Sequence, residues 1–191
     1  MAHVSIIGTG TMGSALSALA EKGGHTVEQL DTSTPDKPVT GDVVILAVPY
    51  PAVQAVLAER KDQLAGKVVV DITNPLDFAT FDALTVPADG SATAEIAAAL
   101  PSSKVLKAFN TTFAGALASG TVGSEPTTVL VAGDDADAKA LLAGIVDAAG
   151  LRAVDAGGLK RARELEALAF LQMTLAAREK IAWTGGFALV P

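Results

Sequence analysis

The sequence predicts an α/β fold with a doubly wound, mostly parallel sheet and a small helical extension at the C-terminus. Short β-branched runs alternate along the chain with segments rich in alanine and leucine. That alternation is typical of a parallel sheet whose strands are joined by crossover helices. Most runs are apolar throughout rather than at every second residue, as expected for strands covered by helices on both faces.

The elements follow from this pattern in chain order. Strands are expected at residues 4–7, 27–30, 43–48, 68–72, 105–109 and 128–132, with a weaker one at 152–155. Helices are expected at residues 11–22, 50–63, 93–100 and 135–149. The connection from Asp31 to Asp42 contains Pro35 and Pro38. Proline interrupts helices, so we expect a loop there and a sheet flank without a full covering helix.

The last 36 residues form the extension. Apolar residues recur at spacings of three and four after Gly158 and predict one long helix from Leu159 to about Ala182. We therefore divide the chain into a dinucleotide-binding part, residues 1–155, and a C-terminal helix and tail, residues 156–191. The tail that begins at Trp183 is apolar, and we expect it to dock on its own sheet or on a second subunit.

Composition excludes several classes of function. The chain has 191 residues, a formal net charge of −7 and no cysteine. Without cysteine there is no disulfide, thiolate metal site or catalytic thiol, and an acidic chain is a poor binder of nucleic acid. The longest uncharged apolar run, Val43–Val53, is too short for a membrane helix. No basic stretch precedes the first apolar residues, so we expect a cytoplasmic protein without a membrane partner.

The strongest motif opens the chain. The strand at residues 4–7 runs into Gly8-Thr9-Gly10-Thr11-Met12-Gly13, and a helix begins at once. Gly8 permits a tight turn, Gly10 lets a diphosphate approach the backbone, and Gly13 lets the helix pack close to the strand. Main-chain N–H groups at the start of the helix can then bind phosphate without a basic side chain. The motif predicts a dinucleotide site, although an ordinary glycine-rich turn is the alternative.

Asp31 ends the second expected strand, 18 residues after Gly13. An acid near this position accepts hydrogen bonds from the adenosine ribose, and its charge disfavours a 2′-phosphate. Thr32 and Ser33 could donate to a phosphate, and Lys37 is the nearest cation along the sequence. These residues favour NAD slightly over NADP, with a simple Asp turn as the alternative.

Ligands of parallel sheets bind at the carboxyl ends of the strands. Asn74 and Asn110 follow the fourth and fifth expected strands, and their amides suit a carboxamide or a ring carbonyl. For Asn74, in an Asn-Pro pair, a turn is an equal alternative.

A proton-transfer catalyst is not evident, and the catalytic residue stays unknown. His3 and His25 fall at the wrong end of the expected sheet, Lys107 is either an acid or a surface charge, and no cluster suggests a metal site. Hydride exchange between two redox cofactors needs alignment more than an acid, so the sequence favours that chemistry.

Several stretches in order resemble the deazaflavin-dependent (coenzyme F420) NADP oxidoreductase family. They are the glycine motif, Ala47-Val48-Pro49, Asp71-Ile72-Thr73-Asn74-Pro75-Leu76, Lys107-Ala108-Phe109-Asn110-Thr111, Val131-Ala132-Gly133-Asp134-Asp135 and Ala162-Arg163-Glu164-Leu165-Glu166. The resemblance implies a Rossmann domain, a homodimer, and hydride exchange between NADPH and a deazaflavin or flavin. It also implies that residues 8–13 hold the diphosphate and that Val48, Pro49, Asn74, Ala108 and Asn110 line the nicotinamide side. Family members often carry a basic residue where Asp31-Thr32-Ser33 stand.

Two other functions compete with this one. A dehydrogenase of the β-hydroxyacid or pyrroline-carboxylate reductase kind shares the glycine motif. Enzymes of that kind carry a substantial helical second domain, whereas only about forty residues follow the last expected strand of this chain. The short extension argues against this class. A dinucleotide-sensing module would bind the cofactor without turnover.

Overall fold

The structure is a computed structural model that describes residues 1–31, 33 and 36–190. Its main sheet has seven strands, β1 (His3–Ile7), β2 (Thr26–Leu30), β3 (Val43–Leu46), β4 (Val68–Asp71), β5 (Lys104–Lys107), β8 (Thr128–Gly133) and β9 (Arg152–Gly157). The helices are α1 (Thr11–Lys22), α2 (Val53–Leu64), α3 (Ala92–Ala99), α4 (Ala114–Ser119), α5 (Ala136–Ala148) and α6 (Ala162–Ala177). Short 3-10 turns, η1 (Tyr50–Ala52) and η2 (Leu159–Arg161), precede α2 and α6. A two-stranded hairpin, β6 (Thr121–Val122) and β7 (Glu125–Pro126), follows α4.

The strand order is β2-β1-β3-β4-β5-β8-β9. The first five strands run parallel, β8 runs antiparallel to β5, and β9 is parallel to β8. The predicted α/β fold with a mostly parallel sheet is therefore confirmed. Chain order reverses beside β1, which is the switch point where open α/β sheets bind ligands.

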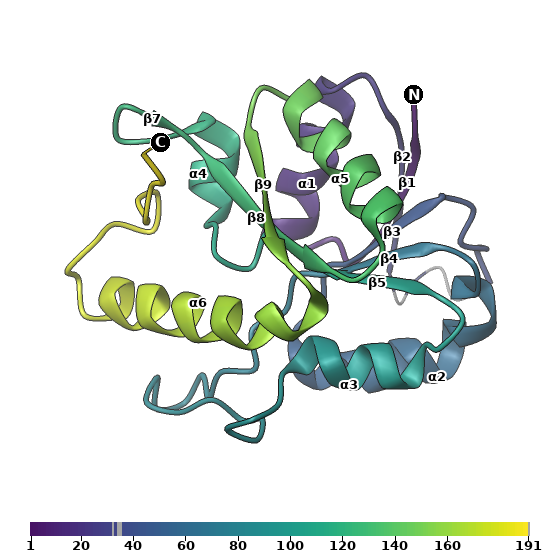
Figure 1. The fold of residues 1–191 in the computed structure, drawn as a ribbon, viewed down its shortest axis with the longest axis horizontal. Coiled ribbons are helices and arrows are strands. Elements are labelled where there is room, and N and C mark those ends of the chain that lie inside the picture. Colours follow the sequence, from purple (N-terminus) through teal and green to yellow (C-terminus); the bar gives the residue numbers. More distant parts are fainter. Residues whose placement is uncertain (32, 34–35, 191) are drawn as a thin grey trace.

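Helices cover both faces of the sheet, as the continuous apolar strands predicted (Figure 1). On β3, Val43 and Ile45 pack in the core under α1 and α5, whereas Val44 and Leu46 pack in the core over α2 and α3. Successive side chains of a strand point to opposite faces, so an all-apolar strand serves two cores at once.

The connection between β2 and β3 is a loop over its described residues, as predicted from its prolines. Val39 of this loop is buried in the core over α2, and the side chain of Gln63 accepts a hydrogen bond from the Val39 amide at 2.8 Å. The loop thus takes the place of a covering helix at that flank.

The C-terminal helix is shorter than predicted, because α6 ends at Ala177 rather than near Ala182. Glu179 takes a positive φ of 57° and turns the chain back. The buried face also differs from the predicted leucine stripe: Leu171 is 51% exposed, while Glu166 and Gln172 are buried. Those two polar side chains bind groups of the main domain, and that fixes which face of α6 turns inward.

Candidate functional site

The glycine turn between β1 and α1 has the geometry that its spacing predicted. Gly8 has φ 122°, and a Cβ built there would lie 2.2 Å from the Ala47 carbonyl oxygen. A Cβ on Gly13 would lie 2.1 Å from the Gly8 carbonyl oxygen. A Cβ on Gly10 would meet no atom within 4 Å. The outer glycines therefore allow close packing, and the middle one keeps the approach to the backbone open.

The N-terminus of α1 begins directly at this turn. Its N-cap residue is Gly10, which provides no capping side chain. The first N–H groups of a helix have no partner within the helix, and together with the helix dipole they attract an anion. The turn can therefore bind a diphosphate without a nearby cation.

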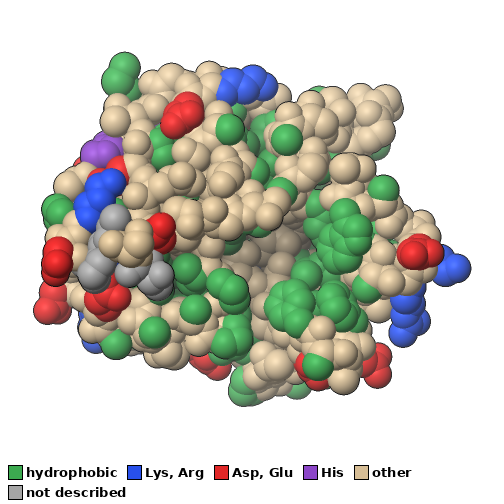
Figure 2. All heavy atoms as spheres, turned by 180° about the vertical axis from the view of Figure 1, so that it is seen from behind, with side chains coloured by type: hydrophobic (Ala, Val, Ile, Leu, Met, Phe, Trp, Pro, Cys, Tyr) green, Lys and Arg blue, Asp and Glu red, His purple; other side chains and the backbone are tan. Residues whose placement is uncertain are grey.

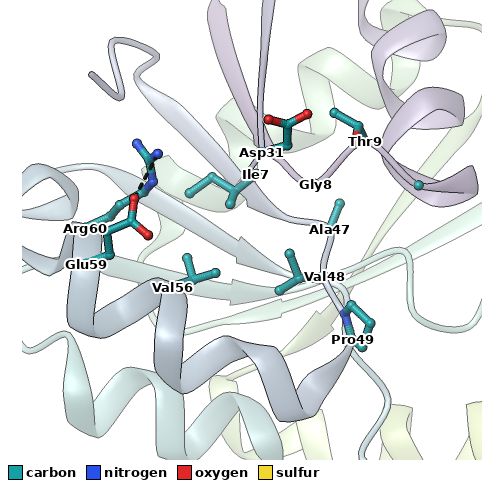
Figure 3. Close-up of a pocket in the computed structure, with 11 residues that line it drawn as sticks. Ile7, Gly8, Thr9, Asp31, Ala47, Val48, Pro49, Val56, Glu59 and Arg60 are labelled. Atoms are coloured by element: carbon teal, nitrogen blue, oxygen red, sulfur yellow. Dashed lines mark ion pairs between the residues drawn. The ribbon is translucent and has the colours of Figure 1, made fainter. Parts of the chain in front are cut away.

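A first cavity of about 280 Å³ extends from this turn along the carboxyl ends of β1, β2 and β3 (Figure 3). Its walls are formed by Ile7, Gly8, Thr9, Gly10, Asp31, Ala47, Val48, Pro49, Val56, Glu59 and Arg60. Seven of the residues predicted from the sequence are thus brought together here. Thr32 lies outside the described residues.

Asp31 lies at the end of β2 beside this cavity. Its Oδ1 accepts hydrogen bonds from the Ser33 amide at 2.8 Å and from the Ser33 hydroxyl at 2.6 Å. Ser33 thus orients the carboxylate and does not itself line the cavity.

Two charged residues of this cavity, Glu59 and Arg60, were missed by the sequence analysis. Arg60 comes from α2 and is 3% exposed. Its Nη1 donates to the Lys37 carbonyl oxygen at 2.8 Å, and its Nη2 lies 3.1 Å from Glu59 Oε1. Arg60 stands 29 positions after Asp31, so proximity along the sequence could not find it. The sequence offered one signal for placing Arg60 at the cavity: it lies on the helix after the third strand, one turn beyond Val56, which also lines the cavity.

A second cavity of about 400 Å³ continues on the other side of the α1 N-terminus. It is lined by Thr11, Met12, Ile72, Asn74, Phe109, Asn110, Thr112, Phe113, Ala114, Gly115, Met173, Trp183 and Thr184. Figure 2 shows a hollow on this side of the molecule with hydrophobic side chains along its margins. Predicted residues Thr11, Met12, Asn74 and Asn110 meet here, whereas Ala108 is fully buried in the core and lines neither cavity.

Asn74 and Asn110 bind each other across the ends of β4 and β5. Asn110 Nδ2 donates to Asn74 Oδ1 at 3.0 Å and to the Leu165 carbonyl oxygen of α6 at 3.0 Å. Because a carbonyl can only accept, the amide orientation of Asn110 is fixed. Its Oδ1 is buried and has no partner among the described residues.

The backbone before Asn110 is strained. Phe109 has a φ of 61° and is 1% exposed. Left-handed backbone is costly for a bulky residue and is found mostly where function requires it. Here Phe109 lies two residues after the end of β5, where the chain enters the wall of the second cavity.

Lys107 is not a surface charge, so that alternative is wrong. It is fully buried, and its Nζ lies 2.9 Å from Asp71 Oδ2 and 3.0 Å from Glu166 Oε1. Glu166 also accepts from the Ala92 amide at 3.0 Å and the Thr93 amide at 3.3 Å, at the N-terminus of α3. One ammonium group thus joins β4, β5 and α6, and it lines neither cavity. A buried charge of this kind needs its partners in place.

Two further titratable residues, His25 and Tyr50, line neither cavity. His25 Nδ1 accepts from the Ala2 amide at 3.0 Å, which gives it a structural role at the opposite end of β1. Burial raises the pKa of the Tyr50 hydroxyl above its ordinary value, and its hydrogen bond to Glu95 acts in the same direction. Among the described residues no group of side chains could hold a metal ion. No helix in the described part of the chain is long and apolar enough to cross a membrane.

Comparison with known proteins gives consistent matches. Residues 18–75 match the model of a family described as "NADP oxidoreductase coenzyme F420-dependent". The chain is similar to the F420-dependent NADP reductase of Methanocaldococcus jannaschii, 36% identical over 151 residues, which is 76% of this chain and 66% of that protein. The enzyme of the same name from Methanothermobacter thermautotrophicus is 34% identical over 157 residues, 78% of this chain and 66% of that protein. The chain therefore spans just under two thirds of the length of these relatives.

Among solved structures, the chain is similar to a protein from Arthrobacter sp. FB24 that is provisionally assigned as an F420-dependent NADP reductase. The structural alignment covers 100% of this chain and 100% of that protein. Its TM-score is 0.87 at 25% sequence identity. A reductive aminase from Aspergillus terreus in complex with NADPH has a TM-score of 0.66 at 17% identity, and it shows the fold alone.

Proposed function

The chain belongs to the coenzyme F420-dependent NADP oxidoreductase family, and from this we propose that it transfers a hydride between a nicotinamide dinucleotide and a deazaflavin. The observation that carries the proposal is the placement of the two cavities. They meet at the N-terminus of α1, where Gly10 lines the first and Thr11 lines the second. One dinucleotide can therefore lie with its diphosphate at the turn, its adenosine in the first cavity and its nicotinamide in the second.

The residues present fit each part of that dinucleotide. The open approach at Gly10 suits the diphosphate, and the Asp31 carboxylate suits a ribose hydroxyl. Asn110 lines the second cavity, and an amide side chain there suits the carboxamide of nicotinamide. Asn74 Oδ1 accepts from Asn110 Nδ2 and so helps to orient that amide.

The reaction needs little from protein side chains. A hydride leaves C4 of the reduced nicotinamide and adds to the deazaflavin ring, and one proton from water completes the reduced acceptor. The reduced deazaflavin and the oxidised dinucleotide are the products, and no acid or base is assigned. The chain's own part is to hold the two rings in contact and to exclude water from between them.

Further features complete the proposal. Residues 1–155 bind the dinucleotide, and residues 156–191 close the acceptor side. The protein works as a cytoplasmic homodimer with a small-molecule redox partner, without nucleic acid or membrane. A flavin is the alternative acceptor. Relatives named for NADP support NADP as the cofactor, whereas Asp31 favours NAD.

Stopped-flow oxidation of NADPH and NADH, with coenzyme F420, FMN and FAD as acceptors, tests the proposal. We expect fast oxidation of one nucleotide with the deazaflavin. Equally slow oxidation with every acceptor, together with tight nucleotide binding in calorimetry, would instead support a dinucleotide sensor. Absence of nucleotide binding would remove both functions.

A further inference from the structure

Lys107, Asp71 and Glu166 form a fully buried charge cluster at the ends of β4 and β5. The Lys107 ammonium has three N–H groups, and the structure gives its Nζ three acceptors. They are Asp71 Oδ2 at 2.9 Å, Glu166 Oε1 at 3.0 Å and the Thr73 carbonyl oxygen at 2.5 Å. These groups come from β4, from α6 and from the turn after β4. One ammonium group therefore fixes three parts of the chain relative to one another.

The cluster holds two carboxylates against one ammonium, and the N-terminus of α3 offsets the difference. The amides of Ala92 and Thr93, the first two residues of α3, donate to Glu166 at 3.0 and 3.3 Å. The Thr93 hydroxyl donates to Asp71 Oδ2 at 2.7 Å. The positive end of the helix dipole also favours a carboxylate there. Each buried carboxylate thus has several donors, and the positions of both are closely defined.

One side of the cluster positions Asn74. Asp71 Oδ1 accepts from the Thr73 amide at 2.8 Å, and Lys107 binds the Thr73 carbonyl oxygen. Thr73 is therefore held by both of its main-chain polar groups. Its carbonyl lies in the same rigid peptide plane as the nitrogen of Asn74, the next residue. The contact with Lys107 therefore sets the direction in which Asn74 leaves the sheet.

The other side of the cluster positions Asn110 through α6. Glu166 binds Lys107, and Leu165, directly before Glu166, accepts at its carbonyl oxygen from Asn110 Nδ2 at 3.0 Å. The same Nδ2 donates to Asn74 Oδ1 at 3.0 Å. Both hydrogens of the Asn110 amide are thus used. The two sides of the cluster therefore meet at a pair of amides that line the second cavity.

We infer that Lys107 is a positioning residue that sets the amides of Asn74 and Asn110 for the carboxamide of nicotinamide. The inference rests on the proposed function, which places the nicotinamide in the second cavity. Lys107 lines neither cavity, so it acts through Thr73 and Glu166 rather than on the dinucleotide. The glycine turn follows β1, and β3 separates β1 from β4 in the sheet. We therefore expect diphosphate binding not to depend on the cluster.

Glu166→Gln tests the inference, and Glu164→Gln is its matched control. Both variants remove one negative charge from α6, but the Glu164 side chain is 44% exposed and pairs with Arg161 at 3.3 Å. A glutamine at position 166 carries an NH₂ group, which would face the N–H donors of Lys107 or of α3. At least one hydrogen bond of the cluster is then lost, whereas the control leaves the cluster intact.

The readout is the contribution of the nicotinamide to binding. Calorimetry compares each dinucleotide with the same molecule without nicotinamide: NADH with ADP-ribose, and NADPH with 2′-phospho-ADP-ribose. The Kd of the shorter molecule divided by that of the dinucleotide measures this contribution. We expect Glu166→Gln to lower the ratio about three- to tenfold, the value of one hydrogen bond. The Kd for the shorter molecule should stay at the wild-type value in both variants.

A second pair of variants keeps the test decisive if Glu166→Gln does not fold. Thr93→Val removes the hydroxyl that binds Asp71, whereas Thr93→Ser keeps it. We expect Thr93→Val to lower the ratio about threefold and Thr93→Ser to keep the wild-type ratio. A cluster with a role in stability alone would lower the melting temperature of Thr93→Val and leave the ratio unchanged.

The stereochemistry of transfer gives an independent readout in an active protein. With NADPH deuterated at one face of C4, the wild type should transfer hydrogen from one face only. Glu166→Gln should transfer a measurable fraction from the other face, because a loosened carboxamide lets the ring turn over. A loss of stability alone would reduce the amount of active protein without mixing the two faces.

Binding and turnover separate this inference from the proposed function. If the ratio falls in Glu166→Gln and Thr93→Val but the wild type reduces no acceptor, the proposed hydride transfer fails and the positioning role stands. If turnover occurs and both variants keep the wild-type ratio, Lys107 is not a positioning residue. A wild-type ratio of one, or an equal loss of affinity for the dinucleotide and the shorter molecule, also overturns the inference.

Discussion

The two cavities of this protein are built in different ways. The first takes its phosphate-binding backbone from one contiguous turn, at residues 8–10, and its other walls from residues 31, 47–49 and 56–60. The second takes residues from five places, between Thr11 and Thr184. Backbone recognition needs only the right local conformations, whereas recognition by distant side chains needs every element around them in place. The first cavity should therefore respond to local changes of shape, and the second to changes far from it.

The largest expected effect tests how the second cavity is supported. Lys107→Met leaves the buried carboxylates of Asp71 and Glu166 facing each other without their cation. We expect a loss of about 3–5 kcal/mol in the free energy of unfolding, measured by urea denaturation. Lys139→Met is the control, because its ion pair with the 61% exposed Asp155 side chain should contribute at most about 1 kcal/mol. Similar losses in both variants would show that the buried cluster does not fasten α6.

The next effect tests the packing of the glycine turn. In Gly13→Ala the new methyl group would approach the Gly8 carbonyl oxygen to 2.1 Å, so α1 must move away from β1. We expect a loss of about 1–3 kcal/mol in stability together with loss of NADPH binding. Thermal unfolding and calorimetry measure both. A variant of wild-type stability would mean that the turn adapts more easily than this contact suggests.

Gly10→Ala separates recognition from packing. The added methyl group meets no protein atom within 4 Å, so the melting temperature should stay at the wild-type value. The methyl group would stand where the diphosphate approaches, and we expect the Kd for NADPH to rise about tenfold, or roughly 1.4 kcal/mol. Unaltered NADPH affinity would place the diphosphate elsewhere.

The smallest effect concerns the choice between the two nucleotides. Asp31→Asn keeps the shape and the hydrogen bonds from Ser33 but removes the negative charge beside the expected ribose. We expect the preference for NADPH over NADH, as a ratio of kcat/KM values, to rise about three- to tenfold. Raising the salt concentration should reduce this difference, because salt screens exposed charges. A ratio that does not move would show that Asp31 does not face the ribose.

Most of the fold could be predicted from the sequence. The seven strands of the main sheet and helices α1, α2, α3 and α5 follow from local apolar runs, and the loop after β2 follows from its prolines. The short elements α4, β6 and β7 were missed because they span only six, two and two residues. So few residues give no detectable period.

The residues of the candidate site fall into two groups, those that could be identified from the sequence and those that could not. The glycine turn, Asp31 and the residues after β3 were identified from their positions at strand ends. Arg60, Thr112 and Trp183 were not, because each reaches its cavity through packing of elements distant in the chain. Glu166 belongs to a stretch that resembles the family, but its buried role was not predicted. A carboxylate on a helix is ordinarily solvated, and only its buried partner Lys107 reverses that expectation.

The sequence by itself determined the parallel sheet and the dinucleotide turn, since both depend on conformational preferences of neighbouring residues. Only the tertiary structure decided which face of α6 turns inward, where the C-terminal segment lies and which residues line the second cavity. Those outcomes depend on satisfying buried charges and amides across the whole molecule, which no short stretch of chain encodes.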